Sequence, residues 1–193
     1  SEIKVFKKYG LDIKFEDIKQ FSGTSPKYFF TSFIKKYNLD TDYKIMLKQK
    51  EKYFYYMLVK HAKIFPGIYK KVKELNQDGF KLGLDSSSPK RFIDFVLKNF
   101  NLEKYFDVVV SSDHVKNSKP DPEIFLLASE ELKIKPKDCI VIEDAVNGII
   151  AAKKAGMKVI AVTNKNKKKK LKEADQILNS IKELNLEKIQ DLI

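Results

Sequence analysis

The stretch from Cys139 to Gly156, CIVIEDAVNGIIAAKKAG, constrains the fold of this chain more than any other. It opens with four apolar, β-prone residues that show no polar alternation, which is typical of a strand buried on both faces. Small and apolar residues at helical spacing follow, and Gly156 is placed to end that helix. The stretch therefore predicts a strand, a turn and a helix, with the adjacent acids Glu143 and Asp144 in the turn.

The two acids have two interpretations. Parallel α/β sheets bind ligands at the carboxyl ends of their strands, which is where Glu143 and Asp144 fall. Carboxylates also cap helices, because they accept hydrogen bonds from the free N–H groups of the first turn and favour its positive end. The stretch by itself leaves both interpretations open.

Strand and helix patterns alternate from Pro66 onward, and this succession predicts an α/β fold with a doubly wound parallel sheet. Turn residues such as Asp78-Gly79 and Pro89 separate the segments. The expected strands are residues 80–84, 108–110, 139–142 and 159–162, with a short edge strand at 175–178, and the expected helices are 68–77, 90–100, 123–132 and 146–155, with helical turns in 181–193.

Residues 1–63 have only helical patterns, and we expect them to form an α-helical domain ahead of an α/β core at 64–193. Asp40 or Thr41 is placed to cap a long helix that runs to His61. The block is rich in aromatic residues, which could form a helix-bundle core or a stacking platform for bases. Their helical spacing favours the core.

The net charge of +12 comes almost wholly from lysine, because Arg91 is the only arginine. Arginine is the preferred residue for bidentate contacts with phosphates and bases, so a sequence-specific nucleic-acid reader is disfavoured. The lysines are spread over nearly every segment, and the run Lys167–Lys170 is interpreted as a solvated loop. The charge therefore indicates an attraction for anionic small molecules.

Composition also bears on the compartment. The hydrophobic content of 43% is enough for a folded core, and no apolar run approaches the roughly 20 residues that span a bilayer. Cys139 is the single cysteine, cannot form an internal disulfide and is interpreted as a core residue. With no signal-peptide pattern at its start, the sequence predicts a cytoplasmic protein with no membrane partner.

Three strand ends carry side chains that suit a phosphate and a metal ion. Ser86 follows the first expected strand, Lys119 stands before a proline after the second, and Glu143 and Asp144 follow the third. A hydroxyl and free N–H groups at a strand-to-helix turn can hold phosphate oxygens, and a lysine adds a point charge for them. Carboxylates together with water suit Mg²⁺, which prefers hard oxygen ligands. The ordered set predicts a site for a phosphate and Mg²⁺.

On these residues the sequence resembles the haloacid dehalogenase (HAD) superfamily, in the branch of sugar-phosphate phosphatases and β-phosphoglucomutase-like enzymes. The family's second, third and fourth motifs are similar to segments that end in GLDSSS, read SKPDPEIF, and read VIEDAVNGIIAAKKAGM. The resemblance implies that the hydroxyl of Ser86 and the amide of Ser87 bind phosphate, and that Lys119 balances the charge of the nucleophile and phosphoryl group. It also implies that Asp144 is a Mg²⁺ ligand and that Glu143 supports the metal shell.

The resemblance covers essentially the whole chain. It implies a Rossmann-like core, an α-helical cap formed by residues 1–63, and a small phosphorylated metabolite as substrate. A cap loop that carries Gly-x-x-Arg in the mutase reads Gly23-Thr-Ser-Pro26 here, with Lys27 beside it as a substrate contact. This difference favours hydrolysis over phosphomutase activity. Asp85 stands where small residues are usual, and its charge would oppose phosphate unless it turns away or pairs with a lysine.

The family's first motif, Asp-x-Asp-Gly-Thr/Val, occurs nowhere in the 193 residues. In the family its first aspartate is the covalent nucleophile and its second is the general acid/base. We therefore expect a chain that begins inside the cap and has no turnover by itself. Three functions stay open: a Mg²⁺-dependent phosphatase, a phosphomutase with the same aspartyl-phosphate, and a non-catalytic binding module.

The strand before the first motif lies in the middle of the family's sheet, between the strands expected here at 80–84 and 139–142. We therefore predict that these two strands do not pair with each other. Because neighbouring strands are about 4.7–4.9 Å apart, a slot of roughly 9–10 Å should separate them. An N-terminal segment, a cleaved fragment or a partner's strand would fill that slot.

Overall fold

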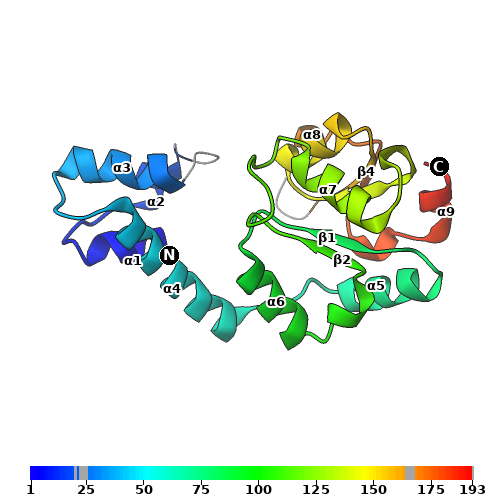
Figure 1. Ribbon diagram of the computed structural model, residues 1–193, viewed down its shortest axis with the longest axis horizontal. Coiled ribbons are helices and arrows are strands. Elements are labelled where there is room, and N and C mark those ends of the chain that lie inside the picture. Colours follow the sequence, from blue (N-terminus) through cyan, green and yellow to red (C-terminus); the bar gives the residue numbers. More distant parts are fainter. Residues whose placement is uncertain (20, 22–25, 164–167, 193) are drawn as a thin grey trace. The chain divides into compact units, whose positions relative to one another are not determined.

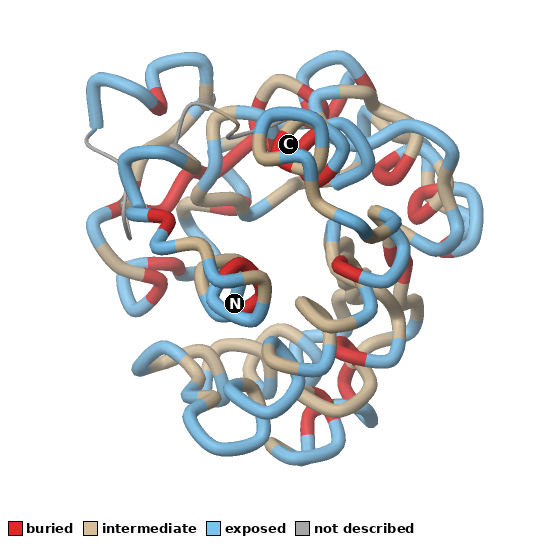
Figure 2. Tube along the Cα trace, turned by 90° about the vertical axis from the view of Figure 1, so that its left-hand side faces the viewer, coloured by how far each residue is buried: buried red, intermediate tan, exposed pale blue. Residues whose placement is uncertain are grey.

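The computed structural model describes residues 1–19, 21, 26–163 and 168–192. The chain divides into two compact units, residues 1–63 and residues 64–193 (Figure 1). Figure 2 shows the buried positions as short stretches separated by exposed ones along the helices, which is the pattern of helices with one face toward a core. Within the described ranges, no helix combines the length and apolar character needed to cross a membrane.

The first unit consists of α1 (Glu2–Lys7), α2 (Phe15–Lys19), α3 (Pro26–Tyr37) and α4 (Tyr43–His61). Aromatic rings of α1 and α3 form its core: the ring of Phe6 lies 4.5 Å from that of Phe33 and 5.8 Å from that of Phe29, measured between centroids. The helix-bundle interpretation of the aromatics is therefore confirmed for α3. It is wrong for Tyr55 and Tyr56, which are 44% and 55% exposed. They lie in the last turns of α4, a helix longer than α1 and α3.

The N-terminus of α4 corrects the sequence prediction of its cap. Asp42 is the cap, because its backbone is extended and its Oδ1 accepts a hydrogen bond of 2.7 Å from the N–H of Lys44. Thr41, one of the two expected caps, instead makes a 3.1 Å hydrogen bond with the Tyr9 hydroxyl. The Asp40–Thr41 prediction was thus displaced by one or two positions.

The second unit alternates strands and helices, as the sequence pattern predicts. All strand pairs are parallel, so the α/β class with a doubly wound parallel sheet is confirmed. In chain order the elements are α5 (Ile68–Gln77), β1 (Gly83–Asp85), α6 (Lys90–Asn99), β2 (Val108–Val110), α7 (Glu123–Leu132), β3 (Ile140–Glu143), α8 (Val146–Lys154), β4 (Lys158–Val162), β5 (Gln176–Leu178) and α9 (Leu186–Gln190).

The helices cover both faces of the sheet because side chains alternate along a strand. Val159 and Ala161 of β4 pack in the cluster that contains α7 and α8. Ile160 and Val162, the intervening residues, pack in a second cluster with β5, α9 and part of α5. Figure 1 shows α7 and α8 on one side of β1 and β2, and α5 and α6 on the other.

Among the described residues the strands form two separate groups, β1–β2 and β3–β4–β5. Asp85 at the end of β1 is level with Val110, and Glu143 at the end of β3 is level with Ala161. β1 and β3 do not pair with each other, as we expected. The expectation that β3 is buried on both faces is wrong, because Ile142 is 40% exposed. No neighbouring strand among the described residues covers β3 on the side away from β4, which accounts for that exposure.

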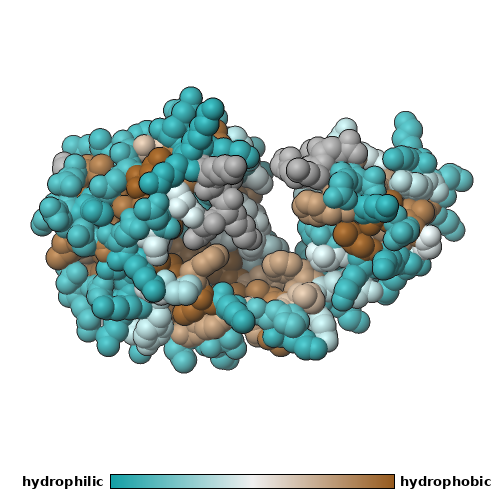
Figure 3. All heavy atoms as spheres, turned by 180° about the vertical axis from the view of Figure 1, so that it is seen from behind, coloured by the Kyte–Doolittle hydropathy of each residue, from teal (hydrophilic) through white to brown (hydrophobic). Residues whose placement is uncertain are grey.

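Lysine residues occur in nearly every segment of the chain. On the face shown in Figure 3, hydrophilic residues cover most of the surface and extend over both units. Lys168–Lys170 forms a 3₁₀ turn with exposed side chains, and Lys167 lies outside the described residues. Cys139 stands just before β3, half-buried and without a disulfide, and burial raises the pKa of its thiol. Cys139 is therefore less buried than the core residue that the sequence predicts.

Candidate functional site

The carboxylate of Glu143 organises the end of β3. Its Oε1 accepts hydrogen bonds from the N–H groups of Asp144, at 3.0 Å, and Ala145, at 3.1 Å. Its Oε2 accepts a 2.9 Å hydrogen bond from the ammonium of Lys119. Glu143 therefore satisfies free N–H groups at the start of α8 and also holds a cation. The hydrogen bonds to these N–H groups support the helix-capping interpretation of Glu143, and its role in a ligand site stays a prediction.

Lys119 comes from the segment between β2 and α7 and is closely surrounded. Its side chain is 12% exposed, and its Nζ lies 4.4 Å from the centroid of the Phe125 ring. The carboxylate of Glu123 fixes the same segment by accepting hydrogen bonds of 2.8 and 2.9 Å from the N–H groups of Lys116 and Asn117. The ammonium is thus held in place by an acid, a ring and an ordered loop.

The ion pair also controls the charge of Glu143. Burial alone would raise the pKa of this carboxyl, but the charge and hydrogen bond of Lys119 and the two backbone N–H groups outweigh it and hold the pKa below its usual value. Glu143 is therefore ionised at neutral pH.

Asp85, at the end of β1, belongs to the same cluster. Its Oδ1 is buried and has no hydrogen-bond partner in the described structure. Burial raises the pKa of Asp85 to about 7; the charge of Lys119 opposes this shift and that of Glu143 adds to it. The extra acid that the sequence revealed thus lies within the electrostatic reach of Lys119 and Glu143, and burial favours its protonated form.

Ser86 and Ser87 follow Asp85 at the turn between β1 and α6. The N–H of Ser86 donates to the carbonyl of Val110 at 3.0 Å, which continues the pairing of β1 with β2. The Oγ of Ser86 accepts a 3.2 Å hydrogen bond from the N–H of Ser88. Ser87 is exposed. No hydrogen bond or ion pair among the described residues joins either Ser86 or Ser87 to Lys119.

Lys27 lies in the first unit, on the first turn of α3. Its side chain is exposed, and its Nζ is 5.9 Å from the centroid of the Tyr43 ring. Residues 23–25 of the predicted cap loop lie outside the described residues. The role of Lys27 as a substrate contact stays a prediction.

Magnesium can be tested against the chemistry of the donor set. Among the described residues, no group of three or more histidine, cysteine or acidic side chains could hold a metal ion. Glu143 is engaged by Lys119 and two amides, and half-buried Asp144 follows it directly in the same turn. Mg²⁺ commonly takes one or two carboxylates and completes its shell with water and substrate phosphate. The residues present fit that incomplete kind of shell.

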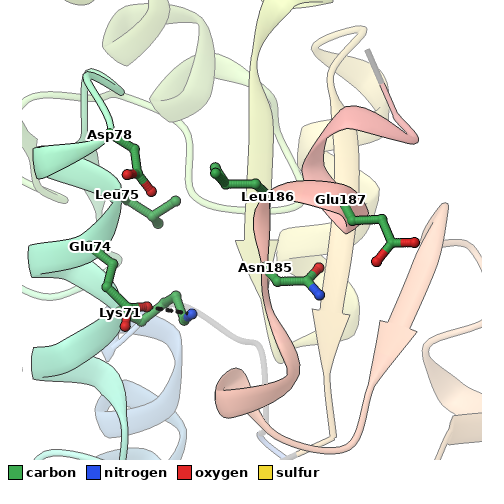
Figure 4. Close-up of a pocket in the computed structure, with 7 residues that line it drawn as sticks. All are labelled: Lys71, Glu74, Leu75, Asp78, Asn185, Leu186 and Glu187. Atoms are coloured by element: carbon green, nitrogen blue, oxygen red, sulfur yellow. Dashed lines mark hydrogen bonds and ion pairs between the residues drawn. The ribbon is translucent and has the colours of Figure 1, made fainter.

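A cavity of about 390 Å³ lies elsewhere in the second unit, between α5 and the N-terminal end of α9 (Figure 4). Leu75 and Leu186 face it from opposite sides, and Lys71 and Glu74 pair at its edge. None of the site residues predicted from sequence lines it. No sequence pattern indicates this cavity, since its lining residues resemble the ordinary surface of amphipathic helices. The full lining is Lys71, Glu74, Leu75, Asp78, Asn185, Leu186 and Glu187.

Comparison with known proteins decides the family. Residues 3–162 match the sequence profile of the haloacid dehalogenase-like hydrolases. This chain belongs to that family. The strand-end cluster of Lys119, Glu143 and Asp144 falls inside the matched region, and so do Asp85 and Ser86.

Curated relatives of this HAD-like chain include named phosphatases. It is 41% identical over 129 residues to the phosphorylated carbohydrates phosphatase of Thermotoga maritima, a match that spans 62% of the chain and 60% of the relative. It is 36% identical over 99 residues to hexitol phosphatase B of Escherichia coli, a match that spans 51% of the chain and 45% of the relative. The matched region is therefore less than two thirds of either relative.

Solved structures match over a longer range. A β-phosphoglucomutase from Clostridium difficile superposes with a TM-score of 0.80 at 30% identity, covering 97% of the chain and 85% of that structure. A HAD hydrolase from Entamoeba histolytica superposes with a TM-score of 0.86 at 25% identity, covering 99% of the chain and 89% of that structure. The fold of the HAD family, a Rossmann-like core with a helical cap, therefore extends over this chain.

Proposed function

We propose that this chain is the cap and most of the core of a Mg²⁺-dependent phosphatase that hydrolyses a small phosphorylated metabolite, such as a sugar phosphate. The observation that carries the proposal is the ion pair of Lys119 with Glu143 at the end of β3, in electrostatic contact with the end of β1. Relatives that are named phosphatases of phosphorylated carbohydrates and hexitols support this substrate class. The cytoplasmic location stays a prediction from the sequence.

The chain's own residues would bind the phosphoryl group. Ser86 accepts one hydrogen bond through Oγ, so its O–H remains available to donate to a phosphate oxygen. The exposed turn at Ser87 would offer its N–H, and the ammonium of Lys119 would supply a positive point charge. Because Lys119 is only 12% exposed, its attraction for a dianion is less screened than that of a surface lysine.

Asp144 would hold Mg²⁺, and Glu143 would keep the turn and Lys119 in place around it. When bound, Mg²⁺ would neutralise charge on the phosphoryl oxygens. This assignment places one carboxylate of the turn after β3 on the metal, and a shell completed by water and phosphate fits it.

The covalent step needs a carboxylate nucleophile, and the family's Asp-x-Asp-Gly sequence is not among the 193 residues. Within the described ranges, β1 and β3 each lack a neighbouring strand on one side. A strand that carries the motif would insert there, supplied by an N-terminal segment, a cleaved fragment or a partner. Its carboxylate oxygen would bond to phosphorus while the phosphorus–ester oxygen bond breaks and the leaving alcohol takes a proton. Water would then cleave the aspartyl-phosphate to release inorganic phosphate.

A phosphomutase is the second candidate, because β-phosphoglucomutase is among the structures that superpose on the chain. It would use the same intermediate and return the phosphoryl group to another hydroxyl of the sugar. The Gly23-Thr-Ser-Pro26 segment lacks the arginine expected for a second phosphate grip, which favours hydrolysis. Product analysis separates the two, since hydrolysis gives inorganic phosphate and mutase activity gives an isomer.

Two measurements test the proposal. Titration with inorganic phosphate and Mg²⁺ should shift the amide resonances of Ser86 and Ser87, and Lys119→Met should weaken that binding. The chain alone should release no phosphate, whereas a synthetic apolar strand ending in Asp-x-Asp-Gly-Thr should restore release. The same strand with Asn in place of its first Asp is the control. Turnover by the repurified chain alone that is lost in Asp144→Ala would show that the nucleophile lies elsewhere.

A further inference from the structure

Gly148, in the first turn of α8, lies directly against the side chain of Glu143. A Cβ built on Gly148 would be 2.5 Å from Cγ of Glu143 and would overlap its carboxylate. Gly148 itself is buried and has an ordinary helical backbone without a positive φ. The conformation of the chain therefore does not require glycine here, and what the position requires is space.

We propose that Gly148 is a positioning residue of the strand-end cluster, acting through Glu143. The missing Cβ leaves the room in which the Glu143 carboxylate folds back over the start of α8. Only from that place does one oxygen accept the N–H groups of Asp144 and Ala145 while the other holds Lys119. The consequence for phosphate binding rests on the proposed function; the placement of Glu143 does not.

A methyl group at position 148 cannot be accommodated by a small adjustment. The carboxylate is the end of a flexible side chain, but three hydrogen bonds hold it, one of which is the ion pair with Lys119. To clear the methyl group it must swing away and give these up together. Lys119 would then lose its partner at 2.9 Å and turn toward Asp85, whose Oδ1 is buried without a partner. The added methyl group would thus displace the cation that is proposed to bind phosphate.

A double-mutant cycle tests this inference. Gly148→Ala in the natural chain should shift the amide resonances of Asp144 and Ala145 and weaken inorganic phosphate binding roughly tenfold, a change of about 1.4 kcal/mol. In a Glu143→Ala background the same substitution should change phosphate binding less than about twofold, because no carboxylate remains to be displaced. Gly83→Ala is the matched control: its Cβ would meet only Leu132, at 3.3 Å, and it should leave both amides unchanged.

Each result of the cycle decides between the inference and a simple packing role for Gly148. Equal losses in both backgrounds, or unshifted amides of Asp144 and Ala145, would overturn it. If Gly148→Ala fails to fold but Gly148→Ala with Glu143→Ala folds, the overlap with Glu143 is established; if neither folds, the inference is wrong. If the natural chain binds no phosphate, the proposed function fails, and the amide shifts still report on Glu143.

Discussion

The ammonium of Lys119 and the Oε2 atom of Glu143 are 2.9 Å apart, and their side chains are only 12% and 13% exposed. This contact joins the loop before α7 to the end of β3. A paired charge at such low exposure becomes costly when its partner is removed, because the remaining charge is left without compensation. Removing either partner should therefore destabilise the fold.

We predict that Lys119→Met lowers the free energy of unfolding by about 2–4 kcal/mol, since it leaves Glu143 charged and poorly solvated. Lys153→Met is the matched control: it breaks the 2.8 Å pair with Asp175, in which Lys153 is 39% exposed. Exposed pairs contribute about 0–1 kcal/mol, so its effect should be smaller. Urea unfolding at pH 7 measures both. Equal losses for the two variants would contradict the enclosed character of the Lys119–Glu143 pair.

The first unit gives a prediction about the cap of α4. Asp42→Ala should cost about 1 kcal/mol, because the N–H of Lys44 loses its 2.7 Å acceptor. Asp40→Ala, two residues away and exposed, should change stability by less than about 0.5 kcal/mol. Thermal unfolding followed by circular dichroism compares the two. A larger effect at Asp40 would restore the cap that was expected from sequence.

Much of the second unit could be predicted because apolar patterns and turn residues bracket its elements. α5, β2 and α7 have the predicted bounds. The first strand was expected at 80–84 and is found at Gly83–Asp85. Residues 80–82 do not form part of the strand. The N–H of Leu82 donates a hydrogen bond of 2.8 Å to the Asp107 carboxylate, and Phe80 packs against the hydrophobic cluster around β4 and β5.

The site was predictable as a set of strand ends but not as a set of contacts. Order along the chain indicates that Ser86, Lys119 and Glu143 follow three strands, and the sheet rule indicates one edge. It cannot show that Lys119 pairs with Glu143, 24 positions away, and not with Asp85. Nor can spacing reveal the space at Gly148, since that depends on which way the Glu143 side chain turns.

Asp85 should make stability depend on pH. Its pKa in the folded chain, about 7, lies above the ordinary 3.8, so folding favours the protonated form. The contribution of this carboxyl to the free energy of unfolding is fully present below pH 3.8 and is lost as the pH rises from 3.8 toward 7. Three units of pKa correspond to about 4 kcal/mol, an upper estimate.

Asp85→Asn, which cannot ionise, should therefore be more stable than the natural chain at pH 8 by up to about 4 kcal/mol and nearly equal to it at pH 4. Urea unfolding at the two values measures the difference. The comparison between variants cancels the titration of groups that both share. A difference that is the same at pH 4 and pH 8 would show that Asp85 is not the titrating group.

The last prediction concerns the side of β3 away from β4, where the described part of the chain supplies no strand. The carbonyl of Cys139 accepts a hydrogen bond from the N–H of Lys158. The backbone groups of residues 139, 141 and 143 therefore face β4, because the direction alternates along a strand. The N–H groups of Ile140 and Ile142 point away from β4. On β1, the N–H of Ser86 donates to β2. The backbone N–H groups of Gly83 and Asp85 therefore point to the opposite side of β1, away from β2. In native-state hydrogen exchange, the amide of Ile142 should therefore exchange much faster than that of Val141.

Adding the strand peptide that ends in Asp-x-Asp-Gly-Thr should slow exchange at Ile142 and Asp85 together, because one inserted strand must satisfy both neighbours. A peptide of the same composition with proline in its middle is the control, since it lacks an N–H needed for the ladder. If Ile142 is already as protected as Val141 without peptide, the side of β3 away from β4 is closed. The sheet would then need no further strand, and a non-catalytic binding module would become the better account of this chain.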